Sequence, residues 1–266
     1  DDGPFVNRAI SDFTPGSIWK TVIMALALEK GYVTGEELFE CKGEVNVGSA
    51  TILCNQSSGG HGWITAKEAL AKSCNSAMIE IGLRIPANEL IEWASHCGFG
   101  KQTMIPLPNE SKGLLPNPEK MFVGDVANCV LGQGYLTVTP IQVAAFYRAI
   151  INDGMYSSPV LLKGVQAQST RLFSASTCKT LQDALLMATQ DGTATQAWVT
   201  GPGSAGKTGT AEVEGNPPQN HAWFAGWCPV VAPKYVICVF SERFGDGPGF
   251  AAPIFGDIAK QLLMCD

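Results

Sequence analysis

The sequence predicts a mixed α/β (α+β) protein with an antiparallel sheet, and two observations support this prediction. Helical patterns dominate the chain up to about residue 190, and short β-rich runs separated by Gly- and Pro-containing turns follow them. Strands joined by such turns pair as antiparallel hairpins, and helices then cover the resulting sheet. With 45% hydrophobic and 16% charged residues over 266 positions, the chain can build a large buried core and is not disordered.

The first helix is expected over 17–30, because the turn Thr14-Pro15-Gly16 starts it and Gly31 stops it. A loop-rich stretch is expected over 41–62, where five glycines interrupt any regular pattern. Three helices are expected over 65–72, 75–83 and 87–97. A Pro-rich surface segment is expected over 106–118.

Thr139-Pro140 is an N-cap followed by a first-turn proline, so it predicts a helix toward Asn152. Another helix is expected over about 176–190. Three strands are expected over 207–213, 222–227 and 234–241. A last helix is expected over 252–264. No linker divides the chain, which predicts one domain over 1–266.

Charge and hydropathy exclude two classes of partner. The chain carries 18 Lys and Arg against 24 Asp and Glu, and a net charge of -6 disfavours nucleic acid. The longest uninterrupted apolar run, Val22–Leu28, is far below the ~18 residues of a membrane helix. The sequence starts Asp1-Asp2-Gly3 without a leader, so we expect it to be a piece of a longer product whose membrane anchor and N-terminal domain are absent here.

Three short motifs that can carry chemistry occur in order along the chain. A Lys-Thr-Gly triplet is expected only about 0.09 times by chance, so its occurrence together with the other two motifs is informative. Gly-x-Ser-x-Gly is absent, and none of the three histidines lies in a setting typical of a serine hydrolase. A serine activated by a lysine is therefore the more economical mechanism. The motifs are Ser17-Ile18-Trp19-Lys20, Ser73-Cys74-Asn75 and Lys207-Thr208-Gly209.

The Ser-x-x-Lys pattern occurs twice, and its context separates the two copies. Ser17 follows Thr-Pro-Gly and lies in the first turn of a helix, where free N–H groups favour an oxyanion. Lys20 follows on the same helix face, among apolar neighbours that favour its neutral form. The second copy, Ser176 to Lys179, precedes an ordinary amphipathic pattern, and we interpret it as a helix cap and a solvated lysine.

The three motifs resemble the signature of penicillin-binding proteins and class A β-lactamases, with Cys74 in place of the aspartate. The chain is similar over nearly its whole length to the transpeptidase domain of class B penicillin-binding proteins. That family implies a penicillin-binding transpeptidase/β-lactamase-like fold, with a five-stranded antiparallel sheet flanked by helices and an all-helical subdomain. Further shared segments are 7–10, 15–17, Gly98-Phe99-Gly100, Gly132-Gln133-Gly134, 139–142, Gly192-Thr193-Ala194 and 205–211.

The resemblance also implies a division of labour at the catalytic centre. Ser17 attacks the bond between two terminal D-alanines of a peptidoglycan stem peptide, and Lys20 takes the hydroxyl proton. Ser73 and Lys207 return a proton to the departing D-alanine. Asn75 binds the substrate amide.

The same resemblance assigns the substrate-binding strand. Backbone N–H groups of Ser17 and Thr210 form the oxyanion hole, and the hydroxyls of Thr208 and Thr210 hold the terminal carboxylate. Gly209 lets the strand approach a ligand closely. No cofactor is implied.

The implied partners are peptidoglycan stem peptides, β-lactam antibiotics as substrate mimics, and a membrane glycan polymerase. The implied location is the extracytoplasmic face of the bacterial cell membrane.

Two alternatives to a transpeptidase remain open: a β-lactam sensor, and a hydrolase of the β-lactamase or D,D-carboxypeptidase type. Class A β-lactamases position their deacylating water with a glutamate, typically in a Glu-x-x-x-Asn pattern. Between Ser73 and Lys207 no glutamate has Asn four residues later, which disfavours that type of hydrolase.

Cysteines provide a second candidate site. The chain has nine, an odd number, so at least one thiol is free or paired outside the chain. Cys41, Cys54 and His61 lie in the Gly-rich stretch and allow three interpretations. The first is a Cys41–Cys54 disulfide, the second is free thiols, and the third is a metal site completed by Cys74 or a carboxylate.

Overall fold

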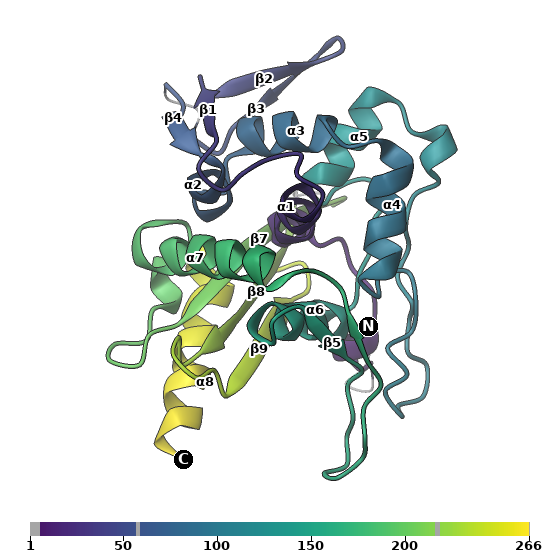
Figure 1. Ribbon diagram of the computed structural model, residues 1–266, viewed down its shortest axis with the longest axis vertical. Helices are drawn as coiled ribbons and strands as arrows, with labels where there is room; N and C mark the ends of the chain where they lie inside the picture. The colour runs from purple at the N-terminus through teal and green to yellow at the C-terminus, as the bar shows by residue number, and fades with distance from the viewer. Residues whose placement is uncertain (1–5, 57–58, 216–218, 266) are drawn as a thin grey trace.

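The computed structural model describes residues 6–56, 59–215 and 219–265. At its centre lies an antiparallel sheet with the strand order β7 (Ala205–Val213), β8 (Gln219–Cys228) and β9 (Tyr235–Ser241). The three strands follow one another in sequence and pair with their chain neighbours, as the turn-rich pattern predicts (Figure 1).

The central sheet has three strands within the described residues, not the five expected from the resemblance. The remaining six described strands pair with one another in three separate two-stranded sheets instead of extending the central one. These are β1 (Leu38–Cys41) with β4 (Gly62–Thr65), β2 (Glu44–Val47) with β3 (Ala50–Leu53), and β5 (Met155–Ser157) with β6 (Ser169–Arg171).

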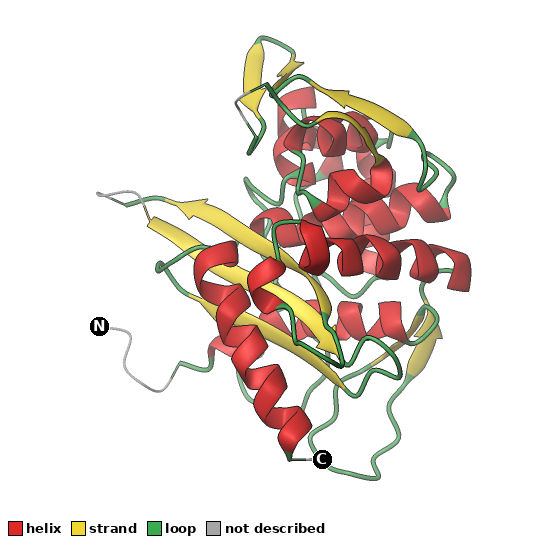
Figure 2. Cartoon of the chain, turned by 90° about the vertical axis from the view of Figure 1, so that its left-hand side faces the viewer, coloured by secondary structure: helices red, strands yellow, loops and turns green. Residues whose placement is uncertain are grey.

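Both faces of the central sheet are buried, and β8 shows how the sequence achieves this. Side chains alternate between the two faces of a strand. Trp223 and Trp227 pack into the main hydrophobic core, whereas Phe224 packs against Phe255 with ring centroids 4.4 Å apart. Phe255 belongs to the last helix, α8 (Ala252–Met264), which lies along one face of the sheet in Figure 2. The aromatic residues Trp223, Phe224 and Trp227 of this strand are therefore core residues.

Three longer helices lie on the other side of the sheet, and the last two of them contact its strands directly. They are α1 (Lys20–Glu29), preceded by the 3-10 turn Gly16–Trp19, then α6 (Pro140–Ile151) and α7 (Ala175–Asp191). α1 is almost entirely buried and lies between the sheet and the upper helices in Figure 1. The predicted bounds of these three helices agree with the structure to within a few residues.

The upper part of the molecule in Figure 1 is mainly helical, as expected, but it also carries the β1–β4 and β2–β3 pairs. Its helices are α2 (Ala66–Ala71), α3 (Asn75–Leu83), α4 (Ala87–His96) and α5 (Val123–Val130). Short helical turns occur at Arg8–Ile10, Pro118–Lys120, Thr195–Ala197 and Gly247–Ala251.

The Thr-Pro-x-Gln segment has a clear structural role. Thr139 and Gln142 form a reciprocal capping box at the start of α6. The Gln142 side chain also donates to the carbonyl oxygens of Lys101 (2.7 Å) and Lys112 (2.9 Å). This buried amide therefore fixes the loops around the Gly-Phe-Gly segment against α6.

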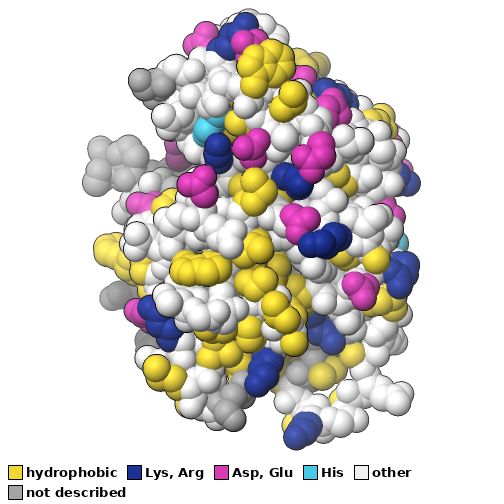
Figure 3. All heavy atoms as spheres, turned by 60° about the vertical axis from the view of Figure 1, so that its left-hand side comes forward, with side chains coloured by type: hydrophobic (Ala, Val, Ile, Leu, Met, Phe, Trp, Pro, Cys, Tyr) yellow, Lys and Arg dark blue, Asp and Glu magenta, His cyan; other side chains and the backbone are white. Residues whose placement is uncertain are grey.

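The exposed charges are distributed rather than gathered. On the face shown in Figure 3, acidic and basic side chains alternate. Arg84, for example, contacts both Glu37 and Glu80. Among the residues that the structure describes, no helix combines the length and apolar composition needed to cross a lipid bilayer.

Candidate active site

The three motifs meet at one place, between the start of α1, the turn from α2 to α3, and the strand β7. Lys20 Nζ donates to the Ser73 carbonyl oxygen (2.9 Å), to Ser73 Oγ (3.3 Å) and to Asn75 Oδ1 (2.6 Å). The Lys207-Thr208-Gly209 segment of β7 packs against the Ser17 turn, because a Cβ at Gly209 would lie 2.9 Å from the Pro15 carbonyl oxygen and 3.2 Å from Ile18 Cβ. Residues far apart in the sequence thus share one buried polar site.

The turn that carries Ser17 lies directly against β7. Gly16 has φ +57°, and a Cβ there would collide with the carbonyl group of Thr210. The N–H of Gly16 donates to the carbonyl oxygen of Gly132 (2.9 Å), within the Gly-Gln-Gly segment. On the other side, the Trp223 indole donates to the Thr14 carbonyl oxygen (3.0 Å). Only glycine fits both the left-handed backbone and the close approach at position 16.

The turn between α2 and α3 presents Ser73 and Asn75 to Lys20. Ser73 has φ +56°, a left-handed conformation that is strained for a residue with a Cβ. The Cys74 N–H donates to the Ala69 carbonyl oxygen (2.9 Å), which closes α2. Cys74 is the N-cap of α3, and its sulfur accepts from the Ala77 N–H (3.5 Å).

Burial determines the protonation of both lysines. Lys20 is fully buried, and this desolvation lowers its pKa to about 8. Burial also lowers the pKa of Lys207 well below its usual value, and the nearby charge of Lys20 lowers that pKa further. Lys207 Nζ donates to the Thr208 carbonyl oxygen (3.1 Å). A substantial neutral fraction of Lys20 at near-neutral pH is therefore expected.

Hydroxyl groups border the site along β7. Thr208 Oγ1 lies 2.8 Å from Thr193 Oγ1, and Thr210 Oγ1 accepts from the Gly247 N–H (3.1 Å). The sequence motifs assign no role to Thr193, although Gly192-Thr193-Ala194 is one of the segments shared with the family. Thr193 follows the end of α7 and contacts Thr208 of β7, which gives the Gly-Thr-Ala segment a structural role.

The Ser17 hydroxyl forms no hydrogen bond with any side chain or backbone group of the described residues. The spacing of three residues suggested that Lys20 would reach it, and the structure instead directs the amine to Ser73 and Asn75. Ser17 follows the glycine that abuts Thr210 and precedes the helix that carries Lys20. Its oxygen is thus not committed to another protein group.

The second Ser-x-x-Lys copy lies at the start of α7. Lys179 is exposed and pairs with Asp183 (2.6 Å), as expected for a solvated lysine. The N-cap of α7 is Ser174, not Ser176, because the Ser174 side chain accepts from the Thr177 N–H (3.3 Å). This copy contributes nothing to the site around Lys20.

All nine cysteines are free thiols, so the Cys41–Cys54 disulfide expected as one alternative is not formed. His221 lies within β8 and is buried. Its Nδ1 accepts from the Arg243 N–H (3.1 Å), which gives it a structural contact.

Comparison with known proteins places these motifs in a family. Residues 1–260 match the model of the penicillin binding protein transpeptidase domain. The chain is 33% identical to penicillin-binding protein PbpB of Mycolicibacterium smegmatis over 285 residues, which cover 95% of this chain and 43% of that protein. It is also 33% identical to stage V sporulation protein D of Bacillus subtilis over 275 residues, covering 95% of this chain and 42% of that protein.

Solved structures agree. The D,D-transpeptidase domain of a peptidoglycan glycosyltransferase from Eggerthella lenta superimposes with a TM-score of 0.90 at 27% identity, covering 100% of this chain and 69% of that one. Penicillin binding protein 3 of Mycobacterium tuberculosis, complexed with aztreonam, gives 0.89 at 28% identity, covering 99% and 65%. The chain spans less than half the length of the two relatives described above. It belongs to the family of penicillin-binding protein transpeptidase domains.

Proposed function

We propose that this chain is a serine-type D-Ala-D-Ala transpeptidase domain, which cross-links peptidoglycan stem peptides through an acyl-enzyme on Ser17. The observation that carries the proposal concerns Lys20, which lies one helical turn after Ser17. Its buried amine contacts Ser73 and Asn75. A buried amine with a pKa of about 8 can serve as a general base, because about a tenth of it is neutral at pH 7 and about half at pH 8.

The acylation step follows from this arrangement. Neutral Lys20 accepts the Ser17 hydroxyl proton while Oγ attacks the carbonyl carbon of the penultimate D-alanine. The oxyanion is stabilised by the backbone N–H groups of Ser17 and Thr210. In a strand, the N–H and C=O of one residue point to the same edge. Since the Thr210 carbonyl faces Gly16, its N–H also points toward the Ser17 turn.

The leaving group needs a proton, and the site contains a route for it. Ser73 Oγ lies 3.3 Å from Lys20 Nζ, so a proton taken by the lysine can pass through the serine to the departing D-alanine amine. Lys207 is buried, and the carboxylate of a bound substrate would favour its protonated form, which then binds that anionic end. The free D-alanine then leaves with that proton, and an ester of Ser17 remains.

Substrate binding is assigned to the free edge of β7 and the groups beside it. β7 is an edge strand among the described residues, so an extended peptide can add to it. The hydroxyls of Thr208 and Thr210 hold the terminal carboxylate. Gly209 has no side chain, so the substrate can approach the strand backbone closely. Asn75 binds the substrate amide with its side-chain N–H, which in the free protein donates to the Leu53 carbonyl oxygen (2.9 Å).

An amine of a neighbouring stem peptide, not water, resolves the acyl-enzyme in this proposal. The amine nitrogen forms the new amide bond, its proton returns through Lys20, and Ser17 is regenerated. Two of the glutamates between Ser73 and Lys207 are committed elsewhere: Glu89 accepts from Tyr32, and the buried Glu110 accepts from Thr103. They are therefore not available to activate a deacylating water.

The wider assignments rest on the relatives. We assign β-lactams as covalent substrate mimics of Ser17, since a similar domain has been crystallised with aztreonam. We also assign the extracytoplasmic face of the bacterial cell membrane as the location and a glycan polymerase as the partner. Residues 1–266 are the catalytic domain in this view, with the anchor and an N-terminal domain outside it.

The experiment is a transfer assay with a synthetic D-Ala-D-Ala stem peptide and a D-amino acid as acceptor amine, followed by mass spectrometry. We expect amide product in excess of hydrolysis product, and we expect Ser17→Ala to abolish both. Ser176→Ala, in the second Ser-x-x-Lys copy, is the matched control and keeps full activity. Hydrolysis product alone, or transfer that persists in Ser17→Ala, would contradict the proposal.

A further inference from the structure

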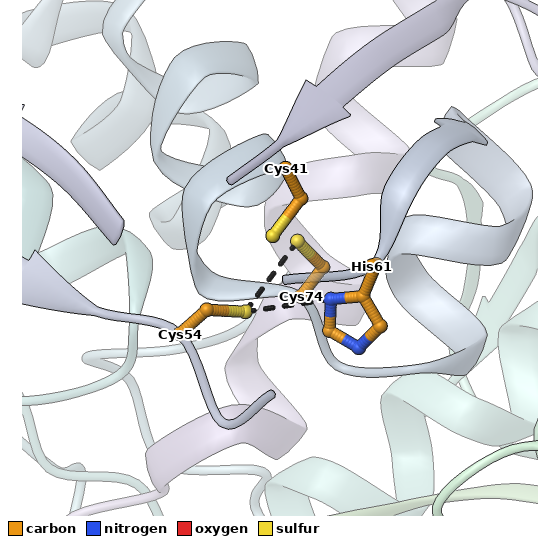
Figure 4. Close-up of side chains that lie close together, drawn as sticks. All are labelled: Cys41, Cys54, His61 and Cys74. Atoms are coloured by element: carbon orange, nitrogen blue, oxygen red, sulfur yellow. Dashed lines mark hydrogen bonds between the residues drawn. The ribbon is translucent and has the colours of Figure 1, made fainter. Parts of the chain in front are cut away.

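Three cysteines and one histidine converge behind the turn that carries Ser73 and Asn75. The sulfur atoms of Cys41, Cys54 and Cys74 and a ring nitrogen of His61 all lie within 4.8 Å of one another. Figure 4 shows the four side chains pointing toward a common centre. None of these side chains has a role in the transpeptidase chemistry proposed above.

The backbone brings these residues together from four separate elements. Cys41 ends β1 and pairs with Gly62 of β4, so His61 lies beside this end of the ladder. Cys54 follows β3, and its N–H donates to the Gly43 carbonyl oxygen (2.8 Å). Gly43 lies two residues after Cys41, so this bond brings the two cysteines together. Cys74 enters from the other side as the N-cap of α3.

The glycine before His61 shows how closely this loop packs. Gly60 has φ +70°, and a Cβ there would collide with the carbonyl group of Cys41. A glycine is therefore required for His61 to reach the cluster. The backbone is arranged so that the imidazole and the thiols face the same point.

The distances fit a tetrahedral zinc ion. With Zn–S bonds of ~2.3 Å and Zn–N bonds of ~2.05 Å, a tetrahedron places two sulfurs about 3.8 Å apart and a sulfur and a nitrogen about 3.6 Å apart. The Cys54 and Cys74 sulfurs are 3.7 Å apart, and Cys54 Sγ is 3.5 Å from His61 Nδ1. Cys41 Sγ, which contacts Ser76 Oγ at 3.7 Å, completes the fourth corner with a small inward shift.

The surroundings also suit a metal rather than separate thiols. Cys41, Cys54 and Cys74 are at most 3% exposed, so an ion bound among their sulfur atoms would be shielded from solvent. The Cys74 sulfur also accepts the Ala77 N–H in the first turn of α3 (3.5 Å), which orients this ligand. His61 also lines a surface cavity of about 350 Å³, so the histidine side of the cluster borders solvent.

We propose that Cys41, Cys54, His61 and Cys74 form a structural Zn²⁺ site that holds the Ser73–Asn75 turn in its active geometry. Four protein ligands close the coordination sphere, so the ion binds no substrate and activates no water. Cys74 stands between Ser73 and Asn75, the two residues that contact Lys20. The Asn75 amide also donates to the carbonyl of Leu53, next to Cys54. Zinc therefore ties the strained turn to β1, β3 and β4.

The test measures metal content before any activity. The chain is purified in reducing buffer without chelator, and zinc is counted by inductively coupled plasma mass spectrometry. We expect about one zinc per chain. Replacement of zinc by Co²⁺ gives an independent readout, because a tetrahedral thiolate site produces intense d–d bands and a sulfur-to-cobalt charge-transfer band.

Single variants assign the ligands. Cys54→Ser and His61→Ala are expected to lose zinc or to weaken its binding at least tenfold in competition with a chromogenic chelator. Cys178→Ser, at an equally buried cysteine on α7, is expected to keep it. Wild-type protein that binds no zinc and no Co²⁺ would overturn the proposal. Zinc retained at full affinity in both ligand variants, or a Cys41–Cys54 disulfide in the isolated protein, would also overturn it.

The link to the catalytic turn has its own readout. We expect removal of zinc by a chelator to slow acylation by a fluorescent penicillin about tenfold or more, and readdition of Zn²⁺ to restore it. Unchanged acylation in zinc-free protein would overturn the positioning role. Because zinc content is measured without penicillin, a failure of the transpeptidase proposal leaves the metal result interpretable.

Discussion

Lys20 Nζ lies 2.6 Å from Asn75 Oδ1, and this contact joins two motifs that are 55 positions apart in the sequence. Both groups sit behind the turn that presents Ser17, so the amine is oriented by protein acceptors before any substrate arrives. Such orientation places a general base with little reorganisation during the reaction. Because of this contact, the position of the Lys20 amine depends on the conformation of the turn between α2 and α3.

Removing the amine tests its role as the base. Lys20→Met is nearly isosteric and takes no charge into the core, so the variant is expected to fold. Acylation by a fluorescent penicillin is expected to slow by about 10²- to 10⁴-fold, the usual contribution of a general base. Lys179→Met, in the second Ser-x-x-Lys copy, provides the matched control. Equal acylation rates in both variants would exclude Lys20 as the base.

The acylation rate should depend on pH in a defined direction. Burial lowers the pKa of Lys20 to about 8, and only the neutral amine accepts a proton. The rate constant is therefore expected to rise with pH and to level off above about 8. Stopped-flow acylation measured from pH 6 to pH 9 gives the profile. A flat profile in the wild type, or one that Lys20→Met reproduces, would contradict the assignment.

Position 16 tests the packing of the nucleophile turn against β7. Gly16→Ala combines a strained left-handed backbone with a collision at the Thr210 carbonyl, so the free energy of unfolding should fall by about 3 kcal/mol or more. Gly31→Ala is the control, because Gly31 also has a positive φ but open space around it. There we expect a loss of about 1 kcal/mol. Urea unfolding that shows equal losses would mean that the close approach does not limit this turn.

The hydroxyl pair at the edge of β7 offers a finer test. Thr193→Val removes the partner of the buried Thr208 hydroxyl at nearly constant volume. We expect the acylation rate to fall by up to about tenfold, because one hydrogen bond is worth about 1 kcal/mol and its partner is left unsatisfied. Thr180→Val, at a partly exposed position of α7 whose hydroxyl donates to the Ser176 carbonyl oxygen, should leave the rate unchanged. A wild-type rate in Thr193→Val would show that this pair does not support the substrate-binding strand.

Local sequence patterns predicted most helices well. The helices at Asn75–Leu83 and Ala252–Met264 have the predicted bounds, since Cys74 caps the first and a proline lies in the first turn of the second. The stretch 41–62, expected as loop, contains β2, β3 and the ends of β1 and β4, because glycines that indicate breaks in the sequence serve hairpins here. The short helix Val123–Val130 was also missed, and its cap relies on an Asp125 contact with the Phe122 N–H (2.9 Å).

The site was predictable only in part, for a physical reason. The motifs nominated Ser17, Lys20 and Lys207, but no local pattern says which groups a buried amine will contact. That Lys20 faces Ser73 and Asn75 depends on a left-handed residue at position 73, which nothing in the sequence signals. The convergence of three cysteines and His61 likewise depends on the pairing of β1 with β4. The glycines in this stretch made that pairing impossible to predict from the sequence pattern.

The central claim is that Ser17 is the acylated nucleophile of a site built by Lys20 and Lys207. The most direct measurement is peptide mapping by tandem mass spectrometry after reaction with a β-lactam. We expect a single adduct on the peptide that contains Ser17, stable for hours and absent from Ser17→Ala. An adduct on Ser73, on Ser176 or on any other residue would contradict this account.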